Sequence, residues 1–151
     1  MTDRSSPIPT TPAPGYAGDV EPTDTWAALE ADPAARLVDV RTKAEWQFTG
    51  TADLAALGNE TRLIEWQSYP DGRPNATFVE TLREAVPETG APVFFLCRTG
   101  ARSAAAARAA TEAGYSAAYN VADGYEGPAD AQGRRSRIAG WRASDLDWSQ
   151  P

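Results

Sequence analysis

A cysteine lies between a short apolar run and an alanine-rich stretch, and this arrangement constrains the fold more than any other feature of the chain. Residues 93–96 (Val-Phe-Phe-Leu) have the length and composition of a buried strand in a parallel sheet. Residues 102–113 are rich in alanine, the strongest helix former, and they end before Gly114, a residue type that often follows a helix. The order of strand, tight loop and helix predicts that Cys97 lies at the carboxyl end of the strand.

The loop after this strand is suited to hold negative charge. Backbone N–H groups of such a loop can turn inward, and the helix behind it adds the positive end of its dipole. Arg98 and Arg102 add full positive charges one and five residues after Cys97. Because these groups favour an anion, we expect the Cys97 thiol to ionise more readily than free cysteine. The alternative, a buried and inert thiol, is common for cysteine, but the arginines and the glycine beside it disfavour that reading.

Three segments of the chain resemble the rhodanese family of sulfurtransferases, in its single-domain form. Residues 97–103 (Cys-Arg-Thr-Gly-Ala-Arg-Ser) match the family's active-loop pattern Cys-x-x-Gly-x-Arg-Ser. Residues 37–41 (Leu-Val-Asp-Val-Arg) with Glu45 match its early strand motif. Residues 120–125, from Asn-Val to Gly-Tyr, resemble the strand and turn that follow the active helix. The segments occur in the family's order, and the resemblance extends from residue 23 to residue 148.

The resemblance implies an α/β fold, a rhodanese-like three-layer domain with a mainly parallel central sheet flanked by helices, and thiosulfate sulfurtransferase activity. In this family the corresponding cysteine takes a sulfane sulfur from a donor such as thiosulfate, becomes a persulfide and passes the sulfur to a thiophilic acceptor. Cys97 is therefore the expected catalytic residue. The chain departs from the family over residues 49–58, which lack its Gly-His-Ile-Pro-Gly-Ala-like passage. The expected substrate-binding residues are Arg98, Thr99, Gly100, Ala101, Arg102 and Ser103.

Two other functions would use similar parts. A non-catalytic or carrier rhodanese module would deliver sulfur to a protein partner or bind one; intact Cys97 and arginines disfavour a dead domain but leave a carrier open. Cysteine-dependent phosphatases and arsenate reductases have an arginine six positions after the nucleophile, whereas this chain has Ser103 there and its arginine at position 102. The shorter loop fits a single sulfur better than a phosphoryl group, so this enzyme class is less favoured.

The absence of histidine excludes several kinds of site. A chain without imidazole cannot use a Cys-His protease mechanism, a histidine proton shuttle or histidine metal ligands. Asp145 and Asp147 show no metal-ligand spacing, and we expect them to be solvated surface carboxylates. The sequence therefore predicts no metal and no cofactor.

Charge and cysteine count limit the partners and the setting. A net charge of −7 over 151 residues disfavours a nucleic-acid surface. Cys97 has no second cysteine for an internal disulfide, no stretch has the length to cross a bilayer, and the amino terminus lacks the apolar region of a secretion signal. We therefore expect a cytoplasmic location and no membrane or nucleic-acid partner. The expected partners are a small anionic, thiosulfate-like sulfur donor and a small thiophile or protein thiol as acceptor.

The pattern along the chain predicts one domain. Residues 1–18 are rich in Pro, Ser and Thr, a composition that buries little apolar surface, so we expect a flexible N-terminal tail followed by a rhodanese-like domain over residues 19–151. Alternating strands and helices favour a mainly parallel sheet. Predicted strands cover residues 36–40, 62–66, 93–96 and 116–121, and predicted helices begin near residues 26, 43, 78 and 102.

Polar and aromatic residues outside the loop carry structural expectations. Asp39 and Arg41 are expected to fix the loops at the end of their strand rather than to act on a substrate. Residues 68–75 contain two prolines and a glycine and form a segment long enough to rim a substrate entrance. Trp141 and Trp148 lie near the end of the chain, which predicts that the C-terminal segment folds back over the domain.

Overall fold

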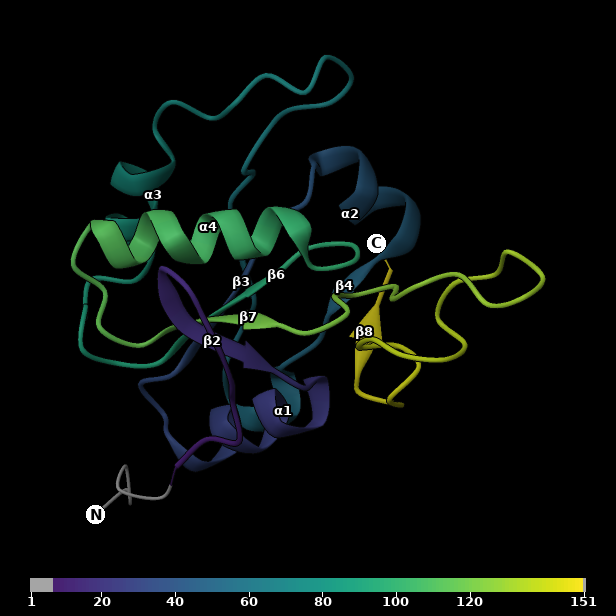
Figure 1. Ribbon diagram of the computed structural model, residues 1–151, viewed down its shortest axis with the longest axis horizontal. Helices are drawn as coiled ribbons and strands as arrows, with labels where there is room; N and C mark the ends of the chain where they lie inside the picture. Colours follow the sequence, from purple (N-terminus) through teal and green to yellow (C-terminus); the bar gives the residue numbers. More distant parts are fainter. Residues whose placement is uncertain (1–6, 151) are drawn as a thin grey trace.

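The computed structural model describes residues 7–150 and has a six-stranded sheet at its centre (Figure 1). The strand order is β1-β2-β7-β6-β3-β5; β1 is antiparallel to β2, and the other neighbouring pairs are parallel. The elements, in chain order, are β1 (Thr11–Ala13), β2 (Tyr16–Val20), α1 (Pro22–Ala31), β3 (Arg36–Asp39), α2 (Lys43–Thr49), β4 (Thr51–Ala52), a 3₁₀ helix (Ala55–Leu57), β5 (Arg62–Leu63), α3 (Phe78–Ala85), β6 (Val93–Leu96), α4 (Ala101–Glu112), β7 (Ala118–Val121) and β8 (Trp148–Ser149).

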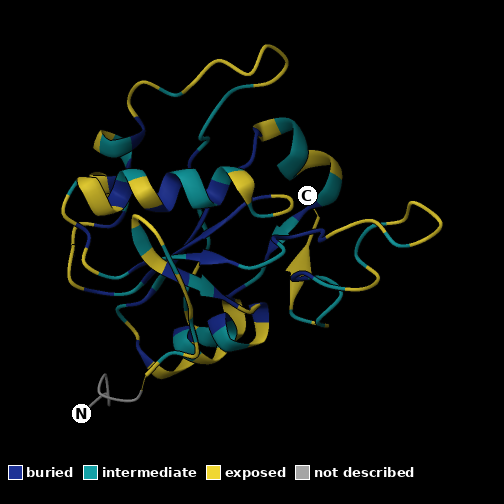
Figure 2. Ribbon diagram, viewed as in Figure 1, coloured by how far each residue is buried: buried dark blue, intermediate teal, exposed yellow. Residues whose placement is uncertain are grey.

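Helices cover both faces of the sheet. In Figure 1, α3 and α4 lie above the strands and α1 lies below them. Two buried apolar clusters correspond to these two interfaces: one includes Leu82 of α3 and Ala107 of α4, and the other includes Leu29 of α1. Figure 2 shows the strands between them as mostly buried. The predicted three-layer α/β domain with a mainly parallel sheet is confirmed.

Strand β6 lies in the middle of the sheet, between β3 and β7. All four of its residues, Val93–Leu96, are buried, which explains why the strand is apolar on both faces. Cys97 follows it directly, so the predicted place of the cysteine at the carboxyl end of this buried strand is confirmed. The alanines of α4 let the helix lie close against the sheet, since Ala106, Ala107 and Ala110 are buried there.

The N-terminal part of the chain differs from its prediction. Residues 1–6 of the predicted tail lie outside the described residues. Within residues 7–18 the structure has β1 and the first residues of β2, and Gly18 of β2 pairs with Tyr119 of β7. The boundary predicted after residue 18 therefore cuts through a strand. The proline-rich composition is compatible with this because β1, which contains Pro12, lies at the edge of the sheet, where a missing N–H leaves the ladder intact.

The C-terminal segment folds back over the domain, as predicted. Trp141 is fully buried, and its indole N–H donates to the carbonyl of Asp147 at 2.9 Å. Further along, β8 pairs antiparallel with β4, which belongs to the departing passage of residues 49–58. Residues 49–58 thus contain β4, which forms a short two-stranded ribbon with β8, and the 3₁₀ helix Ala55–Leu57. Within residues 7–150 each helix is too short or too polar to cross a membrane.

Candidate active site

The loop after β6 places the cysteine sulfur in polar surroundings. Cys97 Sγ lies 3.1 Å from the backbone N–H nitrogen of Gly100 and 3.1 Å from Ser103 Oγ. Gly100 has a φ of 115°, a conformation that L side chains rarely adopt, and it immediately precedes the first turn of α4. The cysteine residue is 1% exposed. Among the loop N–H groups expected to turn inward, that of Gly100 makes this contact.

A chain of hydrogen bonds leads from the sulfur to the far side of β7. Ser103 Oγ lies 2.5 Å from Asn120 Oδ1. The amide of Asn120 donates to Asp19 at 2.9 Å, and this bond turns its oxygen toward Ser103. Tyr16 donates to the same carboxylate at 2.8 Å. Burial and, as a smaller cause, the hydrogen bond to Asp19 raise the pKa of the Tyr16 phenol, so the Tyr16 hydroxyl keeps its proton and donates at neutral pH.

The hydroxyl of Ser103 has one proton for several acceptors: Cys97 Sγ, Asn120 Oδ1 and, at 3.2 Å, the carbonyl of Gly100. It can therefore donate to a thiolate, or donate to Asn120 while accepting from a thiol. The predicted loop residue Ser103 thus contacts the sulfur. Asn120 was identified in the sequence only as part of a motif; its polar side chain in the otherwise apolar end of a strand was the signal of a further role.

Arg102 points toward the start of α2 and binds a carboxylate there. Its Nη1 lies 2.7 Å from Glu45 Oε1, and its Nη2 lies 3.0 Å from Glu45 Oε2. Burial raises the pKa of Glu45, but the hydrogen bonds and charge of Arg102, together with the Thr42 N–H and the charge of Arg41, hold this pKa below its usual range. The bond to Glu45 in turn raises the pKa of Arg102. Glu45 also forms a capping box with Thr42, which fixes its position on α2.

Arg98 has a carboxylate partner of its own. Its Nε lies 3.2 Å from Glu126 Oε2, and the backbone N–H of Glu126 donates to the Arg98 carbonyl at 3.0 Å. The Glu126 side chain is 10% exposed, and Arg142 Nη2 lies 3.9 Å from its other oxygen. Sequence reasoning missed Glu126 because its partner lies 28 positions earlier in the chain.

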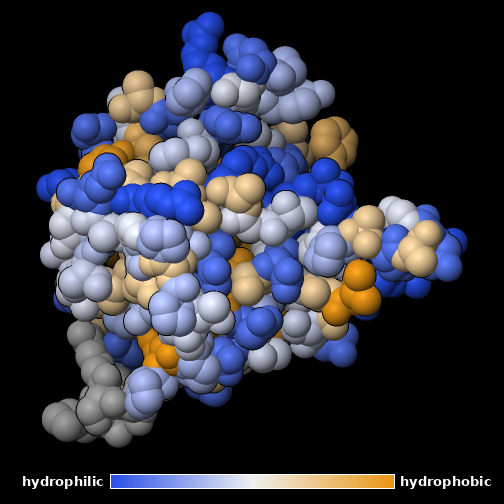
Figure 3. Space-filling model, viewed as in Figure 1, coloured by the Kyte–Doolittle hydropathy of each residue, from blue (hydrophilic) through white to orange (hydrophobic). Residues whose placement is uncertain are grey.

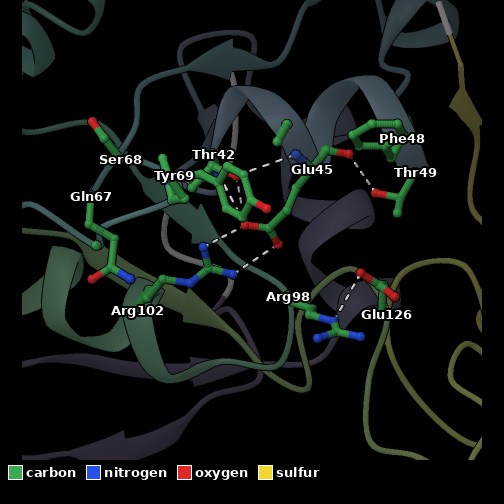
Figure 4. Close-up of a pocket in the computed structure, with 13 residues that line it drawn as sticks. Thr42, Glu45, Phe48, Thr49, Gln67, Ser68, Tyr69, Arg98, Arg102 and Glu126 are labelled. Carbon is green, nitrogen blue, oxygen red and sulfur yellow. Dashed lines mark hydrogen bonds and ion pairs between the residues drawn. The ribbon is translucent and has the colours of Figure 1, made fainter.

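A cavity of about 430 Å³ lies beside the loop. Figure 4 shows the pairs Arg102–Glu45 and Arg98–Glu126 at its wall, with the ring of Tyr69 near the first pair. Cys97 itself is absent from the lining, so its sulfur lies beneath the loop surface that borders the cavity. The lining residues are Thr42, Ala44, Glu45, Phe48, Thr49, Gln67, Ser68, Tyr69, Pro70, Gly72, Arg98, Arg102 and Glu126.

The segment predicted to rim an entrance does border this cavity, through Ser68, Tyr69, Pro70 and Gly72. Of the predicted site residues, Arg98 and Arg102 line the cavity. Gly100 and Ser103 contact the Cys97 sulfur beneath the loop surface.

Asp39 and Arg41 have the structural role expected of them. Arg41 Nη2 lies 2.7 Å from Asp39 Oδ2, and both side chains are fully buried. The same guanidinium donates to the carbonyl of Gly50 at 2.7 Å and to Thr49 Oγ1 at 2.7 Å, and it lies over the Tyr125 ring. The pair therefore ties the end of β3 to the end of α2, beside the cavity. Within residues 7–150 no group of three Cys, Asp or Glu side chains is placed to hold a metal ion.

Comparisons with known proteins find both sequence relatives and solved structures. The family model of the STR4 middle domain matches residues 18–151. An uncharacterized protein of Rickettsia rickettsii (RP600 homolog) is 35% identical over 126 residues, which cover 83% of this chain and 92% of that protein. The chloroplastic protein THYLAKOID RHODANESE-LIKE of Oryza sativa subsp. indica is 31% identical over 136 residues, 89% of this chain and 25% of that one.

Solved structures agree on the fold. The crystal structure of Rv0390 from M. tuberculosis has 50% sequence identity and a TM-score of 0.83, covering 90% of this chain and 99% of that one. The polysulfide-sulfur transferase homodimer of Wolinella succinogenes has 20% identity and a TM-score of 0.58, covering 88% of this chain and 78% of that one. At this identity the second likeness concerns the fold alone.

Proposed function

Because the chain belongs to the family of the STR4 middle domain and has the rhodanese-like fold, we propose that it is a sulfurtransferase in which Cys97 carries the transferred sulfur as a persulfide. The donor is thiosulfate or a similar small molecule with a sulfane sulfur, and the acceptor is a small thiophile or a protein thiol. The observation that carries the proposal is the placement of Cys97 Sγ at the start of α4, 3.1 Å from both the Gly100 N–H nitrogen and the Ser103 hydroxyl.

The reaction has two steps and needs no oxidant or reductant. The Cys97 thiolate attacks the outer sulfur of thiosulfate, the donor's S–S bond breaks, and sulfite leaves with the bonding electron pair. The terminal sulfur now bears the negative charge, which the Gly100 N–H, the Ser103 hydroxyl and the helix dipole stabilise. The acceptor thiolate or cyanide then attacks this sulfur and releases the Cys97 thiolate.

The single cysteine determines how the sulfur leaves. Since the chain has no second thiol, the persulfide has no internal resolving partner and must pass to an external acceptor. A reducing, cytoplasmic setting suits this chemistry, because it keeps both Cys97 and a thiol acceptor reduced.

One observation ranks the phosphatase alternative below sulfur transfer. A phosphatase would need its arginine to wrap around a bound oxyanion, but Arg102 is held by both oxygens of Glu45. Sulfur transfer is therefore the better supported reaction. On the face drawn in Figure 3, hydrophobic residues lie among hydrophilic ones, and the loss of sulfur to small acceptors is what distinguishes a small-molecule enzyme from a carrier.

The test is the mass of the intact protein after incubation with sulfur donors, followed by challenge with cyanide or a thiol. We expect one added sulfur, located on Cys97, that the acceptor removes with turnover. Cys97→Ser should gain no sulfur and show no transfer. Unmodified protein with every donor, or full activity in the Cys97→Ser variant, would remove the basis of the proposal. Stable loading without turnover on any small acceptor would favour the carrier.

A further inference from the structure

The two arginines at the cavity wall are held in different ways. Arg102 donates from both terminal nitrogens to the two oxygens of Glu45. Arg98 makes one side-chain bond, from Nε to Glu126 at 3.2 Å, and its side chain is 48% exposed. Figure 4 shows two lines at Arg102 and one at Arg98. The terminal nitrogens of Arg98 have no hydrogen-bond partner within residues 7–150, so they are available to an anion in the cavity.

A second guanidinium lies on the other side of Glu126. Arg142 Nη2 is 3.9 Å from Glu126 Oε1, whereas Arg98 contacts Oε2, so the carboxylate lies between two arginines. These three side chains carry an excess of one positive charge. Since the Glu126 side chain is only 10% exposed, solvent ions screen its interactions weakly. Arg142 does not line the cavity, and it acts on the site through Glu126.

The C-terminal segment fixes the position of Arg142. Its Nε donates to Ser136 Oγ at 2.9 Å. Its guanidinium carbon lies 5.0 Å from the ring centroid of Tyr125 and 5.0 Å from that of Trp148. These contacts hold one positive charge behind Glu126.

The two arginines therefore differ in what they can do. If Arg98 were the sole cation beside Glu126, turning it toward a ligand would leave a nearly buried carboxylate unpaired, which is costly. Arg142 removes much of that cost because it stays beside Glu126 when Arg98 turns away. The exposed, singly bonded Arg98 is thus the mobile partner, and the stacked Arg142 is the fixed one.

We propose that Arg142 is a positioning residue for sulfur loading: it balances the charge of Glu126 and so leaves Arg98 available to bind the anionic end of the donor. With thiosulfate, Arg98 holds the oxygens of the sulfonate end while the Cys97 thiolate attacks the outer sulfur. The donor's S–S bond breaks, and sulfite leaves with the bonding electron pair. This inference rests on the proposed sulfurtransferase activity and adds to it a residue outside the cysteine loop.

The test is the single-turnover rate of sulfur loading onto Cys97, followed by mass spectrometry over a range of donor concentrations. The probes are thiosulfate, a dianion, and methanethiosulfonate, a monoanion that gives up its outer sulfur in the same way. In Arg142→Gln the half-saturating concentration of thiosulfate should rise about three- to tenfold, with little change in the maximal rate. The rise should be smaller with the monoanion and at high salt, and Arg142→Lys, which keeps the charge, should recover most of the affinity.

Two further variants separate this role from a structural one. Arg135→Gln is the matched control, because Arg135 belongs to the same segment, lies outside the cavity lining and donates to the carbonyl of Gly127 at 2.9 Å. It loses the same charge and should leave the half-saturating concentration unchanged. The double variant Arg142→Gln/Glu126→Gln also removes the carboxylate that Arg142 balances, so its affinity for thiosulfate should return close to that of the wild type. Melting curves of all variants show whether a lost rate comes from unfolding.

The outcomes distinguish the inference from the proposed function. An unchanged half-saturating concentration in Arg142→Gln, an equal rise in Arg135→Gln, or a rise that persists in the double variant would overturn the role of Arg142 while leaving sulfur transfer intact. If neither donor modified Cys97 in the wild type, the proposed function would be overturned and the inference with it.

Discussion

The Ser103 hydroxyl, which contacts the Cys97 sulfur, is oriented by residues outside the cysteine loop. Ser103 Oγ lies between Cys97 Sγ and the amide oxygen of Asn120, and Asp19 fixes the orientation of that amide. A hydroxyl held in this way can donate to the negative charge of a thiolate or of a persulfide without reorganising its neighbours. Ser103 therefore contacts the sulfur in addition to forming part of the first turn of α4. The sequence around it does not distinguish these two roles.

Ser103→Ala should slow sulfur loading onto Cys97 by about tenfold or more, because a hydrogen bond to a charged group contributes about 1.5–3 kcal/mol. The measurement is the single-turnover rate of persulfide formation at neutral pH, with the melting temperature recorded in parallel. Ser116→Ala is the control, since Ser116 bonds only the carbonyl of Thr89 through its side chain and is exposed. An unchanged loading rate in Ser103→Ala would show that the hydroxyl does not stabilise the anion.

Sequence reasoning identified the cysteine loop but not the partners of its arginines. The motif is local, so the order of Cys97, Gly100 and Ser103 is enough to predict that they surround one point. Glu45 lies 57 positions before Arg102, and which carboxylate reaches the guanidinium depends on how α2 packs against the start of α4. The two carboxylates that bind these arginines, Glu45 and Glu126, were therefore not predicted from the sequence.

At the scale of elements, the turn after β7 presses directly on the cysteine loop. Gly124 has a φ of 67°, and a Cβ at this position would lie 2.6 Å from the carbonyl atoms of Arg98 and from the carbonyl oxygen of Cys97. The next residue, Tyr125, donates its N–H to the Cys97 carbonyl at 2.8 Å. The loop therefore takes its shape from two sides: α4 behind it and this turn in front of it.

Gly124→Ala should displace the loop and abolish most sulfur transfer, with a loss of stability of about 2 kcal/mol or more from strain and steric overlap together. Gly58→Ala provides a matched control, because Gly58 has a φ of 66° and a Cβ there has no described atom within 4 Å. The control should lose only about 1 kcal/mol and keep its activity. Chemical denaturation and the loading rate measure the two effects, and equal losses in both variants would refute the steric argument.

The elements that sequence reasoning found are those with local signals. β3, β6, β7 and α4 combine apolar runs or alanine content with clear boundaries, and each was predicted to within a few residues. The short strands β4 and β8 pair across almost a hundred residues of chain, so the local sequence of each does not predict a strand. Strand β1 contains a proline, which disfavours the prediction of a strand there. The first helix begins at Pro22, earlier than the predicted start near residue 26, because proline's fixed φ suits the first helical position.

At the scale of the whole molecule, the C-terminal segment connects helix α1, which covers one face of the sheet, to the turn beside the cysteine loop. Trp141 packs against Trp26 of α1, with ring centroids 6.1 Å apart. Its backbone N–H donates to the Gly124 carbonyl at 2.9 Å. The buried tryptophan therefore anchors the turn that contacts the cysteine loop.

Trp141→Ala should cost about 3–5 kcal/mol of stability, since it removes a fully buried aromatic side chain, and it should loosen the turn at Gly124. The informative comparison is with Leu29→Ala, which opens a cavity in the same cluster under α1. Where both variants remain folded at low temperature, we expect Trp141→Ala to lose the larger share of its loading rate for a given loss of stability. Hydrogen exchange at the N–H of Tyr125 gives an independent readout, because it should accelerate in the tryptophan variant more than in the leucine variant. Matched losses of rate and protection in the two variants would mean that the segment only adds stability and does not hold the loop.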